Sequence, residues 1–305
     1  MIVVAGEGLI DLIIDADATV RAVPGGGPYN TARTIARLGQ PIGFLGRVGT
    51  DRFGRMLLAG LDGDAADLRY VVATDAPTTL AVAELDATGV ASYRFYLDGT
   101  SAAGLTTAEA FRALSESLQC LHVGTLGLVM EPIASSLEQL IAGVGQAVLV
   151  MVDPNCRPIA TRDPARYRAR IERLLPRADV VKVSVDDLTF LQPGCDALTG
   201  ADRILQGGTA VVLLTNGGES VTILTASGHR VLPVAPVDVV DSVGSGDAFG
   251  GAFLAWWSSH ALGRSDLADV DLVAQAAGFA IKVASRTCER VGADPPTLSE
   301  LGGWG

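Results

Sequence analysis

The segment Asp241-Ser-Val-Gly-Ser-Gly-Asp247 leads directly into a run of small residues that includes Ala248, Gly250 and Gly251. A glycine-rich turn at the start of a helix presents several free backbone N–H groups to one point, and the positive end of the helix dipole strengthens their field. This pattern predicts an anion-binding site at the start of a helix over residues 247–260. Glycines inside a helix cost stability, so we expect another element to pack closely against this helix.

Asp247 lies at the mouth of this expected anion site, where two roles are open to it. As a general base it would accept the proton of an attacking hydroxyl group in phosphoryl transfer, where the developing charge on the moving group needs such an anion site. Aspartate is also among the residues that most often cap a helix N-terminus. No Lys-Ser/Thr pair follows the glycines, which excludes a P-loop.

On either side of this segment, short apolar runs alternate with helical patterns. Strands alternating with helices predict a mostly parallel sheet with helices on both faces. We expect strands at residues 2–5, 42–45, 118–123, 148–152, 180–183 and 211–214, and a hairpin near 221–232. We expect helices at residues 28–38, 53–61, 132–144, 164–175, 196–206, 247–260 and 269–284.

Residues 79–97 break this alternation. Two strand-like arms flank Asp86-Ala-Thr-Gly89, which is typical of a β-hairpin. We expect the hairpin to join residues 12–14 in a small sheet outside the main one, where it would cover a ligand. The alternative is an antiparallel edge of the main sheet, because large sheets are often mixed.

The composition limits the class of protein. The 305 residues are 49% hydrophobic and 19% charged, which is typical of a folded protein with a large core. The net charge of −11 disfavours nucleic acid as a partner. The four cysteines match no zinc pattern, and the three histidines are scattered. Without a basic leader or an apolar run of membrane-spanning length, we expect a cytoplasmic protein with no membrane partner.

Two N-terminal segments are candidates for binding hydroxyl groups. Gly25-Gly-Gly27 precedes the expected helix, and Asn30 lies in its first turn; the alternative is an ordinary flexible turn. Asp11 can bind ligand hydroxyls by charge-assisted hydrogen bonds, or it is a solvated strand residue. Gly6-Glu-Gly8 partly matches a dinucleotide fingerprint, but Asp11 replaces the third glycine and no helix follows, which disfavours a dehydrogenase.

Taken in order, five segments resemble the signatures of the PfkB, or ribokinase-like, family of carbohydrate kinases. Each is weak alone, but five in the right order are a strong signal. The resemblance implies an α/β, ribokinase-like three-layer sandwich with a central, mostly parallel Rossmann-like sheet. It implies one kinase domain over residues 1–305, with a small β-sheet lid from about residues 11–22 and 78–98. The segments are Gly25-Gly-Gly-Pro-Tyr-Asn30, Gly46-Arg-Val-Gly-Thr-Asp51, Asp153-Pro-Asn-Cys-Arg157, Lys182-Val-Ser-Val-Asp-Asp187 and Asp241-Ser-Val-Gly-Ser-Gly-Asp247.

The resemblance also implies the site residues and cofactors, namely ATP, Mg²⁺ and K⁺. The implied catalytic residues are Asp247 as general base, the anion hole Gly244, Ser245 and Gly246, and Arg157. The implied sugar-binding residues are Asp11, Gly26, Gly27, Asn30, Arg94, Tyr96, Asn155 and Asp247. The implied ATP-binding residues are Lys182, Ser184, Thr215, Gly217, Gly244, Gly246 and Arg290. Asp187 would hold Mg²⁺ through water, and the backbone carbonyls of Asp241, Val243 and Gly292 would hold K⁺.

Within the family, this sequence looks most like the fructokinases. The similar 2-keto-3-deoxygluconate kinases usually carry an arginine where Leu97 stands, so Leu97 favours a neutral sugar. The resemblance thus implies phosphorylation of a primary hydroxyl group of a neutral sugar, with fructose preferred, by a homodimer that pairs through the lid. A sugar-acid kinase, a ribokinase, a nucleoside or aminoimidazole riboside kinase, and a non-catalytic sugar-binding protein are the alternatives. Arg94 and Arg157 remain candidate anion readers, and Asp187 replaces the family's usual glutamate.

Overall fold

The computed structural model describes residues 1–86, 91–114 and 117–304. Its centre is an eight-stranded sheet with the strand order β14-β13-β12-β11-β10-β9-β1-β4. Strand β13 pairs antiparallel with both β12 and β14, and all other neighbouring strands of this sheet pair parallel. The strands are β1 (Ile2–Ala5), β4 (Ile42–Leu45), β9 (Cys120–Gly124), β10 (Leu149–Asp153), β11 (Val180–Ser184), β12 (Val211–Asn216), β13 (Ser220–Thr225) and β14 (Gly228–Pro233).

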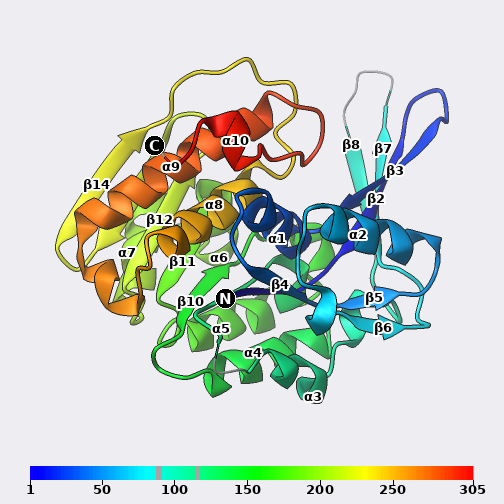
Figure 1. Ribbon diagram of the computed structural model, residues 1–305, viewed down its shortest axis with the longest axis horizontal. Helices are drawn as coiled ribbons and strands as arrows, with labels where there is room; N and C mark the ends of the chain where they lie inside the picture. Colours follow the sequence, from blue (N-terminus) through cyan, green and yellow to red (C-terminus); the bar gives the residue numbers. More distant parts are fainter. Residues whose placement is uncertain (87–90, 115–116, 305) are drawn as a thin grey trace.

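Helices cover both faces of this sheet, so the predicted three-layer α/β sandwich is confirmed (Figure 1). One face carries α1 (Gly27–Arg37), α2 (Arg52–Gly63), α8 (Ser245–Ser259), α9 (Val270–Cys288) and α10 (Leu298–Leu301). The other carries α3 (Thr107–Ala110), α4 (Ile133–Gly143), α5 (Pro164–Leu174), α6 (Val185–Leu191) and α7 (Ala197–Gln206). None of the helices in the described part of the chain is long and apolar enough to cross a membrane.

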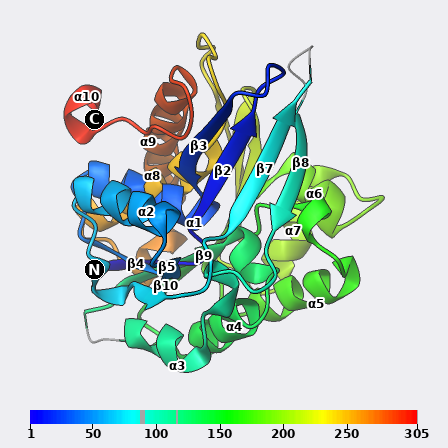
Figure 2. The same cartoon turned by 90° about the vertical axis from the view of Figure 1, so that its right-hand side faces the viewer.

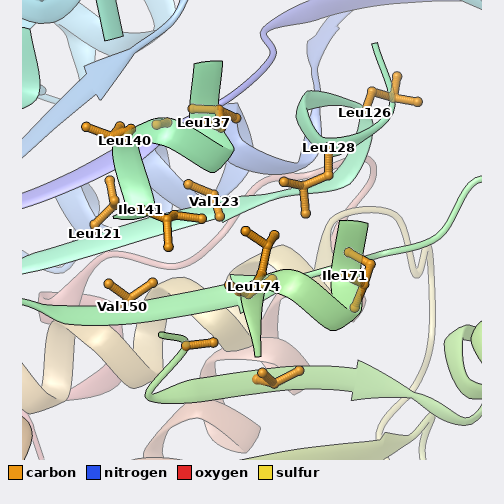
Figure 3. Packing of buried hydrophobic residues seen from close by; sticks show 14 of the residues in the cluster. Leu121, Val123, Leu126, Leu128, Leu137, Leu140, Ile141, Val150, Ile171 and Leu174 are labelled. Carbon is orange, nitrogen blue, oxygen red and sulfur yellow. The ribbon is translucent and has the colours of Figure 1, made fainter. Parts of the chain in front are cut away.

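The central strands are apolar along their whole length because both of their faces are buried. In β1, Val3 faces the cluster under α4 and α5, whereas its neighbour Val4 faces the cluster under α8 and α9. Figure 3 shows the first cluster, where Leu121 of β9 and Val150 of β10 pack with Leu137 of α4 and other helical side chains. This burial explains why continuous apolar runs located the strands in the sequence.

A second, four-stranded sheet with the order β3-β2-β7-β8 projects from the core (Figure 2). Its strands are β2 (Leu9–Ile14), β3 (Val20–Gly25), β7 (Leu80–Leu85) and β8 (Ala91–Tyr96). The prediction of a small separate sheet is confirmed, and the alternative of an edge on the main sheet is wrong. The first two strands extend beyond the predicted span of 11–22. The predicted hairpin turn falls largely on residues 87–89, which lie outside the described residues.

Hydrogen bonds at the base of the small sheet tie it to the core. Asp51, the N-cap of α2, accepts hydrogen bonds from the backbone N–H of Thr78 at 2.8 Å and from its hydroxyl group at 2.6 Å. Beside it, the Thr79 hydroxyl donates to the Thr100 hydroxyl, and Thr100 donates to the Leu97 carbonyl at 2.7 Å. A short parallel pair, β5 (Arg47–Gly49) with β6 (Val72–Thr74), lies beside this junction and was not predicted from the sequence.

The predicted close packing against the glycine-rich helix is provided by α1. Helix α8 begins at Ser245, two residues before its predicted start, after Gly244 in the left-handed conformation with φ 75°. A Cβ atom at Gly251 would lie 2.9 Å from the Thr31 carbonyl oxygen of α1. The glycine therefore lets the two helices approach closely enough to bring their N-termini together.

We expect Gly251→Ala to lower the free energy of unfolding by about 1–3 kcal/mol, because the new methyl group would press on the backbone of α1. Gly278→Ala is the matched control: Gly278 lies inside α9 with nothing within 4 Å of its Cβ position. There, alanine should stabilise by up to about 1 kcal/mol through helix propensity. Denaturant unfolding of both variants checks this, and equal stabilisation by both would contradict the close approach of α1 and α8.

Candidate active site

The carboxyl ends of the parallel strands meet the N-termini of α1 and α8 at one edge of the main sheet. Open α/β sheets bind ligands at this edge. Asp247 occupies the third helical position of α8 and is only 7% exposed. The helix is capped by Gly244 without any side-chain hydrogen bond, so the alternative role of Asp247 as the helix cap is wrong.

Two side-chain amides hold the Asp247 carboxylate. Its Oδ2 accepts a hydrogen bond from Asn30 Nδ2 at 2.9 Å, and its Oδ1 accepts one from Asn155 Nδ2 at 3.2 Å. Burial raises the pKa of Asp247, while the hydrogen bond from Asn30 and the charges of Lys182 and Arg157 oppose that rise. The carboxylate is thus oriented by donors and retains lone pairs with which to accept a proton.

Arg157 fixes the orientation of Asn155. The Arg157 guanidinium donates to Asn155 Oδ1 at 2.7 Å, which turns the amide nitrogen toward Asp247. Asn155 itself has a φ of 39°, a left-handed conformation that asparagine tolerates better than most residues. Arg157 is exposed, and its charge lowers the pKa of both Asp11 and Asp247 against the effect of burial.

Asp11 of β2 belongs to the same group of carboxylates. Its side chain lies against Gly25, where a Cβ atom would collide with Asp11 Oδ2. Burial, followed by the charge of Asp247, raises the pKa of Asp11 to about 6. The structure therefore brings Asp11, Asn30, Asn155 and Asp247 together from four separate parts of the chain.

The expected anion hole is an open turn at the start of α8. Gly244 has to be glycine because of its positive φ and because a Cβ atom there would collide with Ala293. The N–H groups of Gly246 and Asp247 have no acceptor in residues 1–86, 91–114 and 117–304, whereas the Ser245 N–H donates to the Ser242 carbonyl at 3.3 Å. The Ser245 amide, which belonged to the predicted anion hole, is therefore already engaged, whereas the amides of Gly246 and Asp247 are free.

Lys182 of β11 lies beneath this turn. A Cβ atom at Gly246 would lie only 3.0 Å from Lys182 Nζ. The ammonium group is buried and forms an ion pair with Asp153 at 3.0 Å. A fixed positive charge thus adjoins the free amides, an arrangement suited to a phosphate group.

Glu7 and Thr125 support the turn at Gly26 and Gly27. Glu7 is fully buried and accepts hydrogen bonds from the N–H groups of Gly27 at 3.3 Å and Gly127 at 2.8 Å. Burial raises the pKa of Glu7 to about 8. A Cβ atom at Gly27 would collide with the Thr125 hydroxyl group and come within 3.2 Å of Asp247 Oδ1.

Glu7, Thr125 and Asp153 were missed as site residues from the sequence. A carboxylate between two glycines at the end of a strand was a usable signal for Glu7, and Asp153 opens one of the five family-like segments. Thr125 takes a φ of 52°, which no sequence pattern around it indicates.

Some of the predicted ATP-binding residues lie together at the ends of β11 and β12, whereas Arg290 is engaged in ion pairs elsewhere. Ser184 and Thr215 pair at the adjoining ends of β11 and β12, and Gly217 follows with open space at its Cβ position. Arg290 instead forms ion pairs with Glu300 at 2.6 Å and with Asp294 at 3.5 Å. Its hydrogen bond to Glu300 raises the pKa of Arg290, so its charge is already matched within the C-terminal segment.

Asp187, the predicted Mg²⁺ residue, forms a capping box with Ser184 at the N-terminus of α6. It accepts hydrogen bonds from the Cys156 N–H at 2.6 Å and from the Ser184 N–H and hydroxyl group, both at 2.8 Å. It therefore links α6 to the segment that holds Asn155 and Arg157.

The register of the small sheet argues against sugar contacts by Arg94 and Tyr96. Asp11 pairs with Ala81, and Ala81 pairs with Phe95. Arg94 and Tyr96 flank Phe95, so their side chains point to the opposite face from Asp11. Phe95, which the sequence analysis did not select, shares the face of Asp11.

The chain is similar to known carbohydrate kinases. A fructokinase of Rhizobium leguminosarum bv. trifolii is 34% identical over 262 residues, which cover 84% of this chain and 79% of that protein. The structure of a fructokinase from Xylella fastidiosa with bound ATP matches with a TM-score of 0.90 at 27% identity, covering 98% of this chain and 96% of that one. A fructokinase structure from Vibrio cholerae O395 with fructose, ADP and calcium ion matches with a TM-score of 0.84 at 27% identity, covering 96% and 94%.

These likenesses confirm the ribokinase-like fold and the family resemblance that the five segments indicated. The description of the matching family model is "pfkB family carbohydrate kinase", and the match covers residues 1–300. Because it spans nearly the whole sequence, the chain belongs to the PfkB family of carbohydrate kinases.

Proposed function

We propose that this sugar kinase transfers the γ-phosphoryl group of MgATP to a primary hydroxyl group of fructose. The observation that carries the proposal is the buried carboxylate of Asp247, held by Asn30 and Asn155 beside the free amides of α8. The similar fructokinases from Xylella fastidiosa and Vibrio cholerae, which bind ATP or fructose with ADP, support this choice of ligands.

Asp247 acts as the general base. The sugar oxygen attacks the γ-phosphorus, a new O–P bond forms, and the bond from that phosphorus to the departing ADP oxygen breaks. The hydroxyl proton passes to Asp247. The amides of Gly246 and Asp247, together with Lys182, stabilise the negative charge on the transferring group, which is the main task in phosphoryl transfer.

The sugar site lies between the turn at Gly26 and Gly27 and the face of the lid that carries Asp11. Asn30 Oδ1 is buried and has no partner among the described residues, so it offers an acceptor to a sugar hydroxyl group. Asp11 accepts from a further hydroxyl group, and Arg157 keeps Asn155 oriented. Leu97 stands where the kinases of sugar acids usually carry an arginine, so this chain has no positive charge there to bind a carboxylate.

ATP lies along the ends of β11 and β12, with its phosphates at Gly244 and Gly246. Ser184, Thr215 and Gly217 line this path, which ends at the loop before Arg290. The ion pairs of Arg290 confine its role to shaping that loop.

The residues present fit a nucleotide-borne Mg²⁺ ion. Asp153 Oδ1 is buried without a partner in the described part of the chain, and the charge of Asp187, a second carboxylate, is close enough to raise the pKa of Asp153. No group of three or more metal-binding side chains occurs in residues 1–86, 91–114 and 117–304, which agrees with an ion held largely by phosphates and water. When bound, Mg²⁺ would neutralise phosphate charge, and Asp187 would hold it through water.

A K⁺ site fits the loops beside the anion hole. The Asp241 carboxylate accepts hydrogen bonds from the N–H groups of Val243 and Gly292, both at 2.9 Å, and so joins the two loops. The backbone carbonyls of Asp241, Val243 and Gly292 would hold the ion, and that of Gly292, which accepts a hydrogen bond from the Asp294 N–H at 2.8 Å, would use its second lone pair. An ion there would hold Gly244 in place.

The small sheet serves both as a lid over the sugar and as the surface through which two copies of the chain pair. Residues 1–305 form one kinase domain in which the small sheet closes over the sugar and excludes water. On the face of the lid opposite to Asp11, Val20 and Tyr96 are 58% and 51% exposed, which supports pairing of two lids in a homodimer. We expect the enzyme in the cytoplasm, where ATP is available.

Asp247→Asn should lower kcat by at least about 10²-fold, because asparagine keeps the shape of the side chain but accepts no proton. Turnover is measured by ADP release with fructose, and binding of ADP by calorimetry controls for an intact site. Near-normal turnover in a folded variant would remove Asp247 from the role of general base.

The kcat/KM for fructose should fall as the pH drops through about 6. Burial raises the pKa of Asp11 to about 6 and raises that of Asp247, so both carboxylates protonate above their usual range. Protonation removes an acceptor for the sugar and the catalytic base, so activity is lost on the acid side. A pH–rate profile checks this, and a flat profile down to about pH 5 would count against it.

Fructose should exceed ribosides and sugar acids in kcat/KM by at least about tenfold, because hydrogen-bond complementarity discriminates strongly between polar substrates. An ADP-release screen over ketoses, aldoses, sugar acids and ribosides, with K⁺ or choline as the cation, measures this. Preference for a riboside would select a riboside kinase instead, and turnover unaffected by the loss of K⁺ would remove the cation site.

A further inference from the structure

Three polar side chains lie buried on the face of the central sheet that α8 covers. His122 of β9 pairs in register with Met151 of β10, and Met151 pairs with Val180 of β11. Since side chains alternate along each strand, Asp153 and Lys182 point to the same face as His122. His122, Asp153 and Lys182 are 1%, 2% and 4% exposed, so this polar cluster is inside the protein.

Asp153 and Lys182 form the only charged contact within this cluster, with Lys182 Nζ 3.0 Å from Asp153 Oδ2. Removing two charges from water costs free energy, and well-packed apolar side chains are often as stable as a buried ion pair. Stability alone therefore gives little reason to keep such a pair beneath an active site.

Lys182 has donors to spare at this position. Its ammonium group carries three N–H bonds, and Asp153 is its one acceptor in residues 1–86, 91–114 and 117–304. The remaining donors lie beside Gly246, whose missing side chain leaves room for the ammonium group. The free amide of Gly246 and the free donors of Lys182 thus lie close enough together to bind the same anion.

The surroundings of Lys182 keep it charged. Burial works to lower the pKa of Lys182, but Asp153, then Asp187 of α6 and Asp247 of α8, raise it above its usual value. Burial and the neighbouring Lys182 lower the pKa of His122 to about 3, so the imidazole is neutral and adds no competing charge. Lys182 is the one buried cation of this cluster.

We propose that Asp153 is a positioning residue that holds the Lys182 ammonium group against the phosphoryl group in transfer. Asp153 occupies one donor of Lys182 and anchors it to β10, which leaves the other donors directed to the ligand site. This inference rests on the proposed function. It gives Asp153 a role in the reaction that is separate from its fit to Mg²⁺.

Asp153→Asn is the central test, because it keeps the shape of the side chain and removes its charge. We expect kcat to fall by at least about tenfold, with the KM for fructose changed by less than about threefold, since the charge acts in the transition state.

Lys182→Met and the double variant complete a mutant cycle. If Asp153 acts through Lys182, Asp153→Asn should lower kcat by less than about threefold further once the lysine is absent. Fully additive losses in the double variant would overturn the proposal.

Asp179→Asn is the matched control. Asp179 is also a buried carboxylate, 2% exposed, paired with Arg177 and Arg264 at the opposite end of the sheet. Its replacement should destabilise the fold while leaving kcat within about twofold of the wild type. An equal loss of kcat in both aspartate variants would assign the effect of Asp153 to general destabilisation and contradict the proposal.

Nucleotide binding separates this inference from the proposed function. Asp153→Asn should weaken binding of a non-hydrolysable ATP analogue at least about fivefold more than binding of ADP, because Lys182 faces the γ-phosphate. If the wild type phosphorylates no sugar, the proposed function fails, but this comparison still tests Asp153. Wild-type binding of both nucleotides by the variant would overturn the positioning role.

Discussion

The buried charge of Asp247 is the constraint on which the rest of the site depends. A carboxylate removed from water is stable only when donors and positive potential replace its hydration. Here those are the amides of Asn30 and Asn155, the N-terminus of α8, and the charges of Lys182 and Arg157. Removing any of these makes the ionised form of Asp247 more costly.

The same constraint explains the small residues around the site. Asn30 reaches Asp247 because α1 and α8 approach closely at Gly251, and the α8 amides stay open because Gly244 and Gly246 have no side chains. Glycines inside or next to a helix cost stability, which the two apolar clusters of the sandwich offset elsewhere. The glycines thus cost some stability at this edge, but they leave room for an anion at the start of α8.

Carboxylates are concentrated at this edge. Burial raises the pKa values of Glu7, Asp11, Asp153 and Asp247, and the charge of Asp247 adds to the rise for the other three. Their repulsion is relieved locally by Lys182 and Arg157. The cationic groups therefore have a structural as well as a functional reason to be there, and the coupling makes the protonation of each carboxylate depend on the others.

The sequence by itself determined the alternation of main-sheet strands with helices, the parallel sheet and the separate small sheet, and it selected Asp247 as a candidate. Those features follow from local periodicity, from the positions of glycines and from the order of motifs, all of which can be recognised in the sequence alone. Only the tertiary structure decided that Asp247 is not a helix cap, that Glu7, Thr125 and Asp153 belong to the site, and that Arg94 and Tyr96 face away from Asp11. These depend on strand register and on contacts between different elements, such as that of Glu7 with Gly127, 120 positions further along the chain, which local pattern does not encode.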